Sequence, residues 1–306
     1  MPATTPSVPP GRSWVVDAYD LQGTLDGGQA FGWEPHGDAW HGVVQGRWIE
    51  LRRESMRIEA RGAVPIEDWG FLERYLGIHE DLGAMIATFP DDPPLRAAVS
   101  SCPGLRLLRQ DPWEALACFL CSATKQVVQI KEIVRLLRQR HGEPIPAPPA
   151  HAAWTFPSPE RLATLDEEHL RACKLGFRSP NLLAAARAVA EGRLDLDAVR
   201  RMPLPEARAT LMSLRGVGRK VADCALLFGF GFDQAFPVDV WVRTALARLY
   251  FPRARNLGAR RLEHFSETHF GPHGGLAQQY LFHHARTQLG RRWAREARSA
   301  SARRGW

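Results

Sequence analysis

The sequence has 306 residues, about twice the ~150 residues of a typical domain, so it is long enough for two or three modules. Hydrophobic residues make up 45% and charged residues 24%, which excludes a wholly disordered chain. No apolar run approaches the roughly 20 residues of a membrane-spanning helix, and the Pro- and Thr-rich start lacks the apolar core of a secretory signal. Five cysteines are an odd number in a chain too large to need disulfides. We therefore expect reduced thiols and an intracellular location.

Positive charge is concentrated in the second half of the chain. Residues 1–100 contain 8 basic and 15 acidic residues, residues 101–285 contain 25 and 17, and residues 286–306 contain 7 and 1. Such a field suits a polyanion such as nucleic acid, although a solvated basic surface would explain it equally well.

Arginine stays protonated, so a retained lysine marks a position where an amine that can lose its proton is useful. Only four of the 40 basic residues are lysines: Lys125, Lys131, Lys174 and Lys220.

Strand patterns precede helical patterns along the chain. Residues 14–62 alternate in polarity between turn signals, which predicts a meander of short strands that includes 40–44, 48–52 and 56–60. From Ile66 the apolar spacing is helical. The predicted helices span residues 67–76, 80–88, 93–99, 112–123, 125–141, 159–171, 179–191, 195–200, 204–213, 218–229, 239–249, 258–269 and 273–289. Residues 104–109 are interpreted as a lone strand returning to the first sheet, and the Pro-rich residues 141–158 as a long surface loop.

A short glycine-containing turn joins two of these predicted helices. Its residues are Gly216, Val217 and Gly218. Two glycines spaced by one residue allow a tight turn, and the amides at the start of the following helix attract phosphate oxygens. The pattern indicates a helix-hairpin-helix, which holds the DNA backbone without reading sequence. An ordinary helical turn with glycine caps would use the same residues.

We therefore predict an α+β fold, with an N-terminal antiparallel β-sheet domain plus two mainly helical domains that carry the helix-hairpin-helix motif. Residues 1–13 are predicted to be a disordered N-terminus, 14–110 a β-rich domain with flanking helices, 111–285 the helical helix-hairpin-helix core, and 286–306 a basic tail. The first helices, within residues 67–99, could instead pack with the core.

Three reactive side chains follow the turn. Lys220 lies in the first turn of the second helix, and Cys224 lies four residues later on the same face. Asp239 stands where the next helix is predicted to begin, and there the helix dipole and amides keep a carboxylate ionised. A phosphate contact for Lys220 and a simple helix cap for Asp239 are the alternatives to a catalytic pair.

Together these segments resemble the helix-hairpin-helix DNA glycosylase superfamily and, within it, the eukaryotic-type 8-oxoguanine DNA glycosylases. The blocks that carry the resemblance follow the family's order and span roughly residues 14–289. Close matches are 28–33, 107–112, 216–224 and 237–240, and looser ones are 120–122 and 175–178. Residues 277–278 and 281–282 also match, near the C-terminus. The four-cysteine cluster of iron–sulfur relatives is absent after residue 224, and no cofactor is expected. His283 and His284 lack the spacing of a metal pair and are expected on a helix surface.

The resemblance implies a bifunctional base-excision-repair enzyme that flips 8-oxoguanine out of duplex DNA. Lys220 would attack the sugar and displace the base, Asp239 would stabilise the cationic sugar, and the resulting Schiff base would permit AP-lyase β-elimination. One alternative is a monofunctional alkylpurine glycosylase that uses only Asp and water, and Lys220 argues against it. A second is a non-catalytic helix-hairpin-helix DNA-binding protein, against which the combination of Lys220 and Asp239 argues.

The resemblance also assigns contacts to the DNA partner. In the base pocket, the Gly28 carbonyl would accept the N7 proton of 8-oxoguanine, Cys224 and Phe282 would enclose the purine, and Gln278 would bind its Watson–Crick edge beside Pro237. The implied DNA-binding residues are Gly216, Val217, Gly218, Thr124, Lys125, Gln126, Phe177, Arg178 and Trp241. The carbonyls of Met212, Leu214 and Val217 could hold a structural ion, and no catalytic metal is expected. We expect a monomer that acts on double-stranded DNA and has no membrane partner.

Several residues depart from the family's pattern where the opposite base is read. Thr124, Lys125 and Gln126 replace consecutive asparagines. A wedge tyrosine becomes Phe177, an arginine becomes Gln129 and a histidine becomes Trp241, whereas Arg178 matches a contact to the estranged cytosine. The sequence therefore predicts weaker discrimination among opposite bases than is normal for the family.

Overall fold

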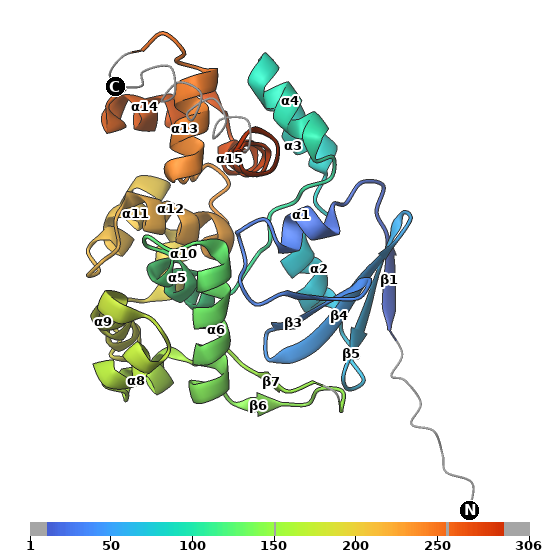
Figure 1. The fold of residues 1–306 in the computed structure, drawn as a ribbon, viewed down its shortest axis with the longest axis vertical. Helices are drawn as coiled ribbons and strands as arrows, with labels where there is room; N and C mark the ends of the chain where they lie inside the picture. The colour runs from blue at the N-terminus through green and yellow to red at the C-terminus, as the bar shows by residue number, and fades with distance from the viewer. Residues whose placement is uncertain (1–10, 150, 255–256, 291–306) are drawn as a thin grey trace, which may run out of the picture.

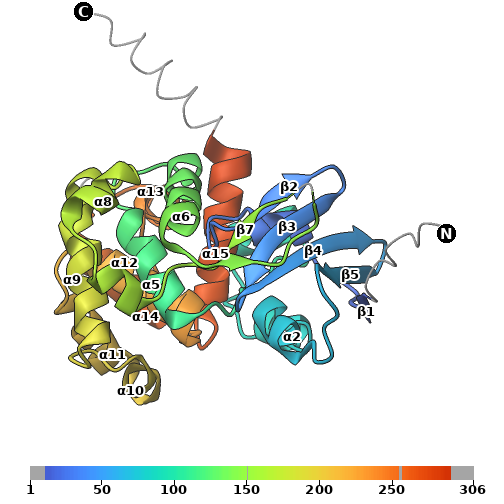
Figure 2. The same cartoon turned by 90° about the horizontal axis from the view of Figure 1, so that it is seen from below.

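The computed structural model describes residues 11–149, 151–254 and 257–290. An antiparallel sheet lies on one side of the molecule and a larger group of helices on the other, with helix α15 (Gly274–His284) between them (Figures 1 and 2). This arrangement confirms the predicted α+β fold. Residues 1–10 of the predicted N-terminal segment and residues 291–306 of the predicted tail lie outside the described residues. The prediction of disorder to residue 13 was wrong at its end, because Arg12 and Ser13 pair with Ala60 and Glu59 in the sheet.

The sheet has the strand order β1-β5-β4-β3-β2, and every neighbouring pair is antiparallel. Gln45 and Gly46 both have positive φ, of 47° and 73°, as a two-residue turn between twisted strands requires. Alternate residues such as Ile58 and Ala60 are buried beneath α1 and α2. The five strands are β1 (Arg12–Val15), β2 (Glu34–His36), β3 (Ala39–Val44), β4 (Arg47–Glu54) and β5 (Arg57–Gly62).

Seven of the described α-helices begin at an aspartate whose side chain accepts a hydrogen bond from the first turn, which satisfies amides that the helix itself cannot pair. In the first half of the chain the helices are α1 (Leu21–Leu25), α2 (Gly70–Leu76), α3 (Leu82–Ala87), α4 (Pro93–Ser101), α5 (Pro112–Cys121) and α6 (Val127–His141). In the second half they are α7 (Pro159–Ala163), α8 (Glu167–Ala172), α9 (Ser179–Ala190), α10 (Leu196–Arg201), α11 (Leu204–Met212), α12 (Arg219–Ala225), α13 (Val240–Leu249) and α14 (Ala259–His269), followed by α15. Shorter turns are η1 (Gly176–Arg178), η2 (Leu226–Phe230) and η3 (Ala285–Leu289).

Three sequence predictions about these elements were wrong. Residues 159–171 form two helices because Asp166 caps a new one, its side chain accepting from the His169 amide. Residues 104–109 form no strand, and the Arg109 amide donates to the Tyr75 carbonyl instead. The predicted loop 141–158 contains a short hairpin of β6 (Pro144–Ile145) and β7 (Ala153–Trp154).

The helical core is organised around α5, whose residues are buried along nearly its whole length. Helix α12 and turn η2 pack on α5, and α15 packs on α4 and α13. The end of α5 therefore meets the start of α12 in the interior of the helical group. No helix in the described part of the chain is long and apolar enough to cross a membrane.

Candidate active site

The predicted helix-hairpin-helix is formed by α11, the turn at residues 213–218 and α12. Gly216 has φ +81°, and a Cβ atom at this position would lie 2.2 Å from Asn181 Nδ2 on α9, so a side chain would be strained and would collide. Gly218 begins α12 and has open space around it, whereas Val217 is buried. Gly216 and Val217 thus pack against the protein, whereas Gly218, at the start of α12, faces open space.

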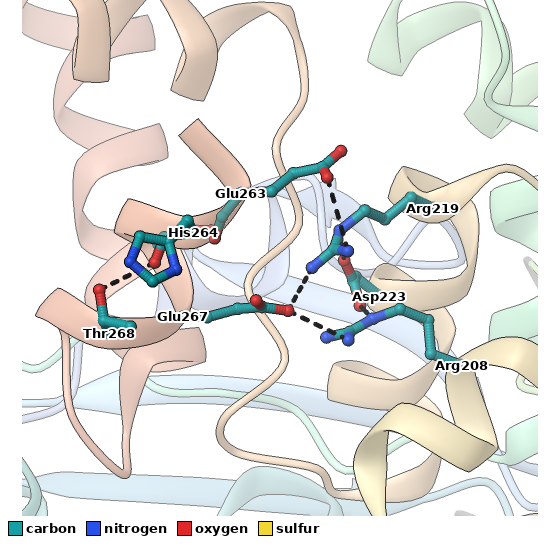
Figure 3. Close-up of polar contacts among 8 residues, drawn as sticks. Arg208, Arg219, Asp223, Glu263, His264, Glu267 and Thr268 are labelled. Atoms are coloured by element: carbon teal, nitrogen blue, oxygen red, sulfur yellow. Dashed lines mark hydrogen bonds and ion pairs between the residues drawn. The ribbon is translucent and has the colours of Figure 1, made fainter. Parts of the chain in front are cut away.

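One buried ion pair and several partly exposed ones join α12 to two other helices (Figure 3). Asp223 of α12 is 1% exposed, and its Oδ1 atom lies 2.6 Å from Arg208 Nε of α11. Arg208 also lies 3.2 Å from Glu267 of α14, and Arg219 contacts Glu267, Asp223 and Glu263. Burial raises the pKa of Asp223, and the two arginines oppose this shift. Paired charges therefore join α11 and α14 to α12, the helix that carries Lys220.

The Lys220 amine points back to the end of α5. Its Nζ atom donates to Ser122 Oγ over 2.9 Å and lies 5.2 Å from the centroid of the Phe119 ring. Ser122 in turn donates to the Phe119 carbonyl. Because the hydrogen-bond partner of Lys220 is a neutral hydroxyl, it offers less support to a charged ammonium than a carboxylate would. In the described residues, no salt bridge pairs Lys220 with a carboxylate.

Asp239 is the N-cap of α13, and its Oδ1 atom accepts from the Val242 amide over 2.8 Å. The preceding Pro237 is buried. The pKa of Asp239 is raised by burial, even though the Val242 amide and the charge of Lys220 lower it. The predicted cap is confirmed, and its amides lower the pKa of Asp239 as expected, but burial acts in the opposite direction and is the largest influence.

Cys224 lies with Lys220 and Asp239 at the same site. The side chain is 4% exposed, and burial raises its pKa to about 12, with Lys220 opposing and Asp239 adding to the shift. A thiol with such a pKa stays protonated at neutral pH and acts as a small apolar wall rather than a nucleophile. The fold thus brings together three residues that the sequence analysis placed at one site.

A second group of predicted residues meets where the sheet domain touches α15. Gly28 has φ +81°, and a Cβ atom there would lie 3.2 Å from the Phe282 ring. Gln278 lies one turn before Phe282, is 4% exposed, and has a buried Oε1 atom without a partner. Its neighbour Gln279 donates to the Gly27 carbonyl over 3.0 Å. The Gln278 Oε1 atom is therefore open to a hydrogen-bond donor.

The residues predicted to read the opposite base form a separate turn. Arg178 is 3% exposed, and its guanidinium donates to the Ala123 carbonyl over 2.7 Å and to Thr124 Oγ1 over 2.6 Å. Thr124 has φ +57°, an uncommon conformation for a β-branched residue. Phe177 is 62% exposed and stacks under Arg178, 4.2 Å from guanidinium carbon to ring centroid. Arg178 therefore supports this turn, while Phe177 projects from the surface.

The remaining predicted DNA contacts have varied surroundings. The Gln126 amide donates to Gln129 Oε1 over 3.1 Å, so both glutamines help to begin α6. Lys125 is half-buried, and its side chain has no hydrogen bond or ion pair among the described residues. Trp241 is 39% exposed, and its ring packs closely over Gly290.

The carbonyls predicted to hold a structural ion are only partly accounted for. The Leu214 carbonyl accepts from the Val217 amide over 3.1 Å within the hairpin turn. No observation of the structure tests whether the Met212, Leu214 and Val217 carbonyls bind an ion, and this stays a prediction.

Sequence reasoning missed two contributors to the site. Ser122 contacts Lys220 from 98 positions away, and Arg208 contacts Asp223 across 15 positions. Ser122 stands in a block that matches the family loosely, so its place after Cys121 was a usable signal. No local pattern marks Arg208, because its partners lie on other helices.

Comparisons with known proteins agree with this geometry. A family model described as "8-oxoguanine DNA glycosylase, N-terminal domain" matches residues 15–116, and one described as "HhH-GPD superfamily base excision DNA repair protein" matches residues 117–268. A "Probable N-glycosylase/DNA lyase" of Methanothermobacter thermautotrophicus is 34% identical over 226 residues, which cover 65% of this chain and 69% of that protein.

Two solved structures are similar over nearly the whole chain. MBOgg1 "in complex with low affinity DNA ligand" has a TM-score of 0.86 and 31% identity, covering 92% of this chain and 96% of its own. The Clostridium acetobutylicum "8-oxoguanine glycosylase/lyase in complex with dsDNA containing cytosine opposite to 8-oxoG" has a TM-score of 0.84 and 27% identity, covering 91% and 98%. These likenesses extend over both the sheet and the helical region.

Proposed function

Since the chain belongs to the 8-oxoguanine glycosylase group of the HhH-GPD base excision repair family, we propose that it removes 8-oxoguanine from duplex DNA and then cuts the strand as an AP lyase. The observation that carries the proposal is the placement of Lys220. Its amine lies at the start of the hairpin helix, bonded to a neutral hydroxyl and beside Asp239 and Cys224. This combination of an amine and a buried carboxyl group suits covalent chemistry at a sugar carbon.

Lys220 is the proposed nucleophile. Its neutral amine forms a bond to the anomeric carbon while the bond from that carbon to the base breaks, and the departing base takes up a proton. Loss of a proton from nitrogen and opening of the sugar ring give a Schiff base. Removal of a proton from the neighbouring sugar carbon then expels the 3′ phosphate, and water releases the enzyme. Ser122 holds the amine in place without the strong charge stabilisation that a carboxylate would add.

Asp239 is proposed to stabilise the positive charge that develops on the sugar. Burial raises its pKa, which means that the surroundings solvate its negative charge poorly. A carboxylate in such surroundings attracts a nearby cation more strongly than one in water does. The N-cap bond to the Val242 amide fixes its orientation at the start of α13.

The proposed base pocket lies between the Gly28 loop and α15. The unpaired Gln278 Oε1 atom offers an acceptor to a purine edge, and the Phe282 ring offers a stacking face. The ring already lies against Gly28, so a flipped base must displace it to enter between them. Pro237 and Cys224 complete the proposed pocket. The Gly28 carbonyl is proposed to accept the proton that distinguishes 8-oxoguanine from guanine at N7.

We assign contacts to the DNA backbone and to the estranged base to residues of the hairpin turn, of the turn at 123–126 and of neighbouring helices. The hairpin residues 216–218 are proposed to bind phosphate through amides, since this turn leads into the open N-terminus of α12. Phe177 is proposed to wedge into the duplex, and Thr124 to Gln126, Arg178 and Trp241 to contact the distorted strand. We further propose a monomer in a DNA-containing intracellular compartment, with domains at residues 14–110 and 111–285. The five cysteines, all free, accord with a reducing compartment.

The proposal is tested by borohydride trapping under single-turnover conditions. Duplexes carry 8-oxoguanine, an alkylated purine or a preformed abasic site, and an unmodified duplex is the control. A covalent adduct and strand cleavage on the 8-oxoguanine and abasic duplexes, but not on the control, would support the proposal. Release of an alkylated base without an adduct would favour a monofunctional alkylpurine glycosylase. Binding without base release or adduct would favour a non-catalytic DNA-binding protein.

A further inference from the structure

Three metal-ligating side chains converge outside the proposed active site. The ligand atoms of Asp20, Cys102 and His283 all lie within 4.8 Å of one another. They come from three separate elements, because Asp20 caps α1, Cys102 follows α4, and His283 lies near the end of α15. The Cys102 thiol donates to Asp20 Oδ2 over 2.7 Å. This is the only such group of three in the part of the chain that the structure describes.

The surroundings of His283 point to a missing partner. Its Nδ1 atom is buried and has no hydrogen bond, whereas the next residue, His284, uses Nδ1 to contact Ser101 Oγ over 2.9 Å. Both histidines lie on α15 as expected and are half-buried, and they differ in that only His283 has an unpaired Nδ1 atom. An imidazole nitrogen without a hydrogen-bond partner has a lone pair that can bind a metal ion. Cys102 is 3% exposed, while Asp20 and His283 are half-buried and give an ion a route from solvent.

We propose that Asp20, Cys102 and His283 bind a zinc-like transition-metal ion. Thiolate, imidazole and carboxylate together form a donor set typical of Zn²⁺, whereas Mg²⁺ and Ca²⁺ prefer oxygen ligands alone. Bond lengths of about 2.0–2.3 Å place tetrahedral ligand atoms some 3–4 Å apart, within the observed spread. Binding breaks the S–H bond of Cys102, forms a metal–sulfur bond and releases one proton to solvent. A water molecule would take the fourth position.

The ion would connect the two walls of the proposed base pocket. Asp20 begins α1, and the chain leaves α1 directly into Gly27 and Gly28. His283 follows Phe282, whose ring faces Gly28. A metal bound to Asp20 and His283 therefore restrains the Gly28 loop relative to α15, with Cys102 joining α4 to both. Its role is structural and goes beyond the proposed chemistry, because none of the three side chains contacts Lys220 or Asp239 in the described structure.

The test uses the full-length protein after chelation and desalting, titrated with Co²⁺ as a spectroscopic probe and then with Zn²⁺. One equivalent of Co²⁺ should give thiolate-to-metal absorption and the intense visible bands of a tetrahedral site, and Zn²⁺ should displace them. Cys102→Ser and His283→Ala should each abolish the thiolate band or weaken binding at least tenfold. Matched controls are Cys173→Ser, another buried free cysteine, and His284→Ala, the adjacent histidine. Circular dichroism confirms that each variant is folded.

Thermal melting provides an independent measurement. Zn²⁺ should raise the Tm of the native chain and of both controls but not that of Asp20→Asn, which keeps a residue able to cap α1 while losing a charged ligand. The proposal is overturned if no thiolate band forms, or if the band survives both Cys102→Ser and His283→Ala. It is equally overturned if Cys173→Ser or His284→Ala removes the band from a folded protein. Borohydride trapping on an abasic duplex does not depend on these outcomes, so a failure here leaves the proposed function untouched.

Discussion

The two sides of the proposed DNA-facing site are built differently. On the nucleophile side, Lys220 stands on a helix that is fixed by the buried pair of Arg208 and Asp223. On the side that would face the opposite base, Thr124 adopts a left-handed conformation in a surface turn, and Arg178 holds that turn through carbonyl and hydroxyl contacts. One side depends on charges paired between helices, and the other on a single arginine beneath an exposed turn.

This difference explains where the sequence keeps the family's pattern and where it departs from it. Removing one member of the buried pair of Arg208 and Asp223 takes away the shortest ion pair of the other, so a change there costs stability. Residues in the exposed turn touch few neighbours, so they can change without loss of the fold. We therefore expect the chemistry to match that of the family and the reading of the opposite base to differ. The following predictions test the two sides in turn.

The largest expected effect is on the nucleophile. Lys220→Gln should abolish both borohydride trapping and base excision while leaving DNA binding nearly unchanged, because glutamine keeps the bulk but cannot form a Schiff base. Lys174→Gln is the matched control, since Lys174 is an exposed lysine paired with Glu132. Trapping that persists in Lys220→Gln would assign the nucleophile to another amine.

Removal of the arginine behind the nucleophile should destabilise the fold. Arg208→Met removes the 2.6 Å partner of the buried Asp223 and leaves it only the 3.6 Å contact with Arg219. Breaking a buried pair costs about 3–5 kcal/mol, and the remaining contact places the expected loss near the lower end. The exposed pair of Arg171 and Glu167 gives a control, because Arg171→Met should cost at most about 1 kcal/mol. Urea unfolding measures both free energies. Equal effects of the two substitutions would show that the buried pair contributes no more than a surface one.

The same variant has a predictable dependence on pH. The pKa of Asp223 is already raised by burial, and loss of Arg208, which lowers it, raises it further. A carboxyl group with a raised folded-state pKa costs no stability below its unfolded pKa of about 4, where both states are protonated. The cost grows as pH rises toward the folded-state value. The destabilisation by Arg208→Met should therefore be smaller at pH 4 than at pH 7, and urea unfolding at the two values checks this.

Asp239→Asn should slow excision by about 10²–10³-fold, the usual effect of losing one group that stabilises charge in a transition state. Asparagine caps helices about as well as aspartate, so the fold should survive. Asp195→Asn, which changes the exposed cap of α10, controls for the cap itself. Single-turnover excision measures the rates. Near-native excision by a folded Asp239→Asn variant would reduce Asp239 to a structural cap.

Features that depend on residues close together in the sequence were predicted more successfully than contacts between residues far apart. The hairpin, Lys220 and the Asp239 cap depend on spacings of a few residues, and each lies where it was predicted. The break at Asp166 was also local, and the run of Asp and Glu before an apolar position was a signal that the analysis overlooked. The lone strand at 104–109 failed because extended residues can bond to helix ends and side chains instead of to a sheet edge.

Interactions between segments far apart in the chain could not be predicted from the sequence. The contact between Lys220 and Ser122 and that between Arg219 and Glu267 join residues far apart in the chain, and neither follows from periodicity. The convergence of Asp20, Cys102 and His283 needs three elements to be placed in space before it is visible. The contacts of Arg178 with Ala123 and Thr124 also join distant segments and were not predicted, whereas its contact to the estranged cytosine stays a prediction.

The smallest expected effect is on the choice of opposite base, which depends on the turn at Ala123 and Thr124 and not on the nucleophile side. Excision of 8-oxoguanine opposite C, T, G and A should differ by less than about tenfold, since each absent base-edge contact removes about 1–3 kcal/mol of selectivity.

Thr124→Asn should strengthen the preference for C, because asparagine offers a short amide and tolerates the positive φ better than a β-branched residue. Thr124→Gly is the control, since it relieves the same backbone conformation without an amide. Single-turnover rates decide the matter: equal gains in both variants would assign the effect to the backbone, and a strong native preference for C that survives Arg178→Ala would contradict the prediction.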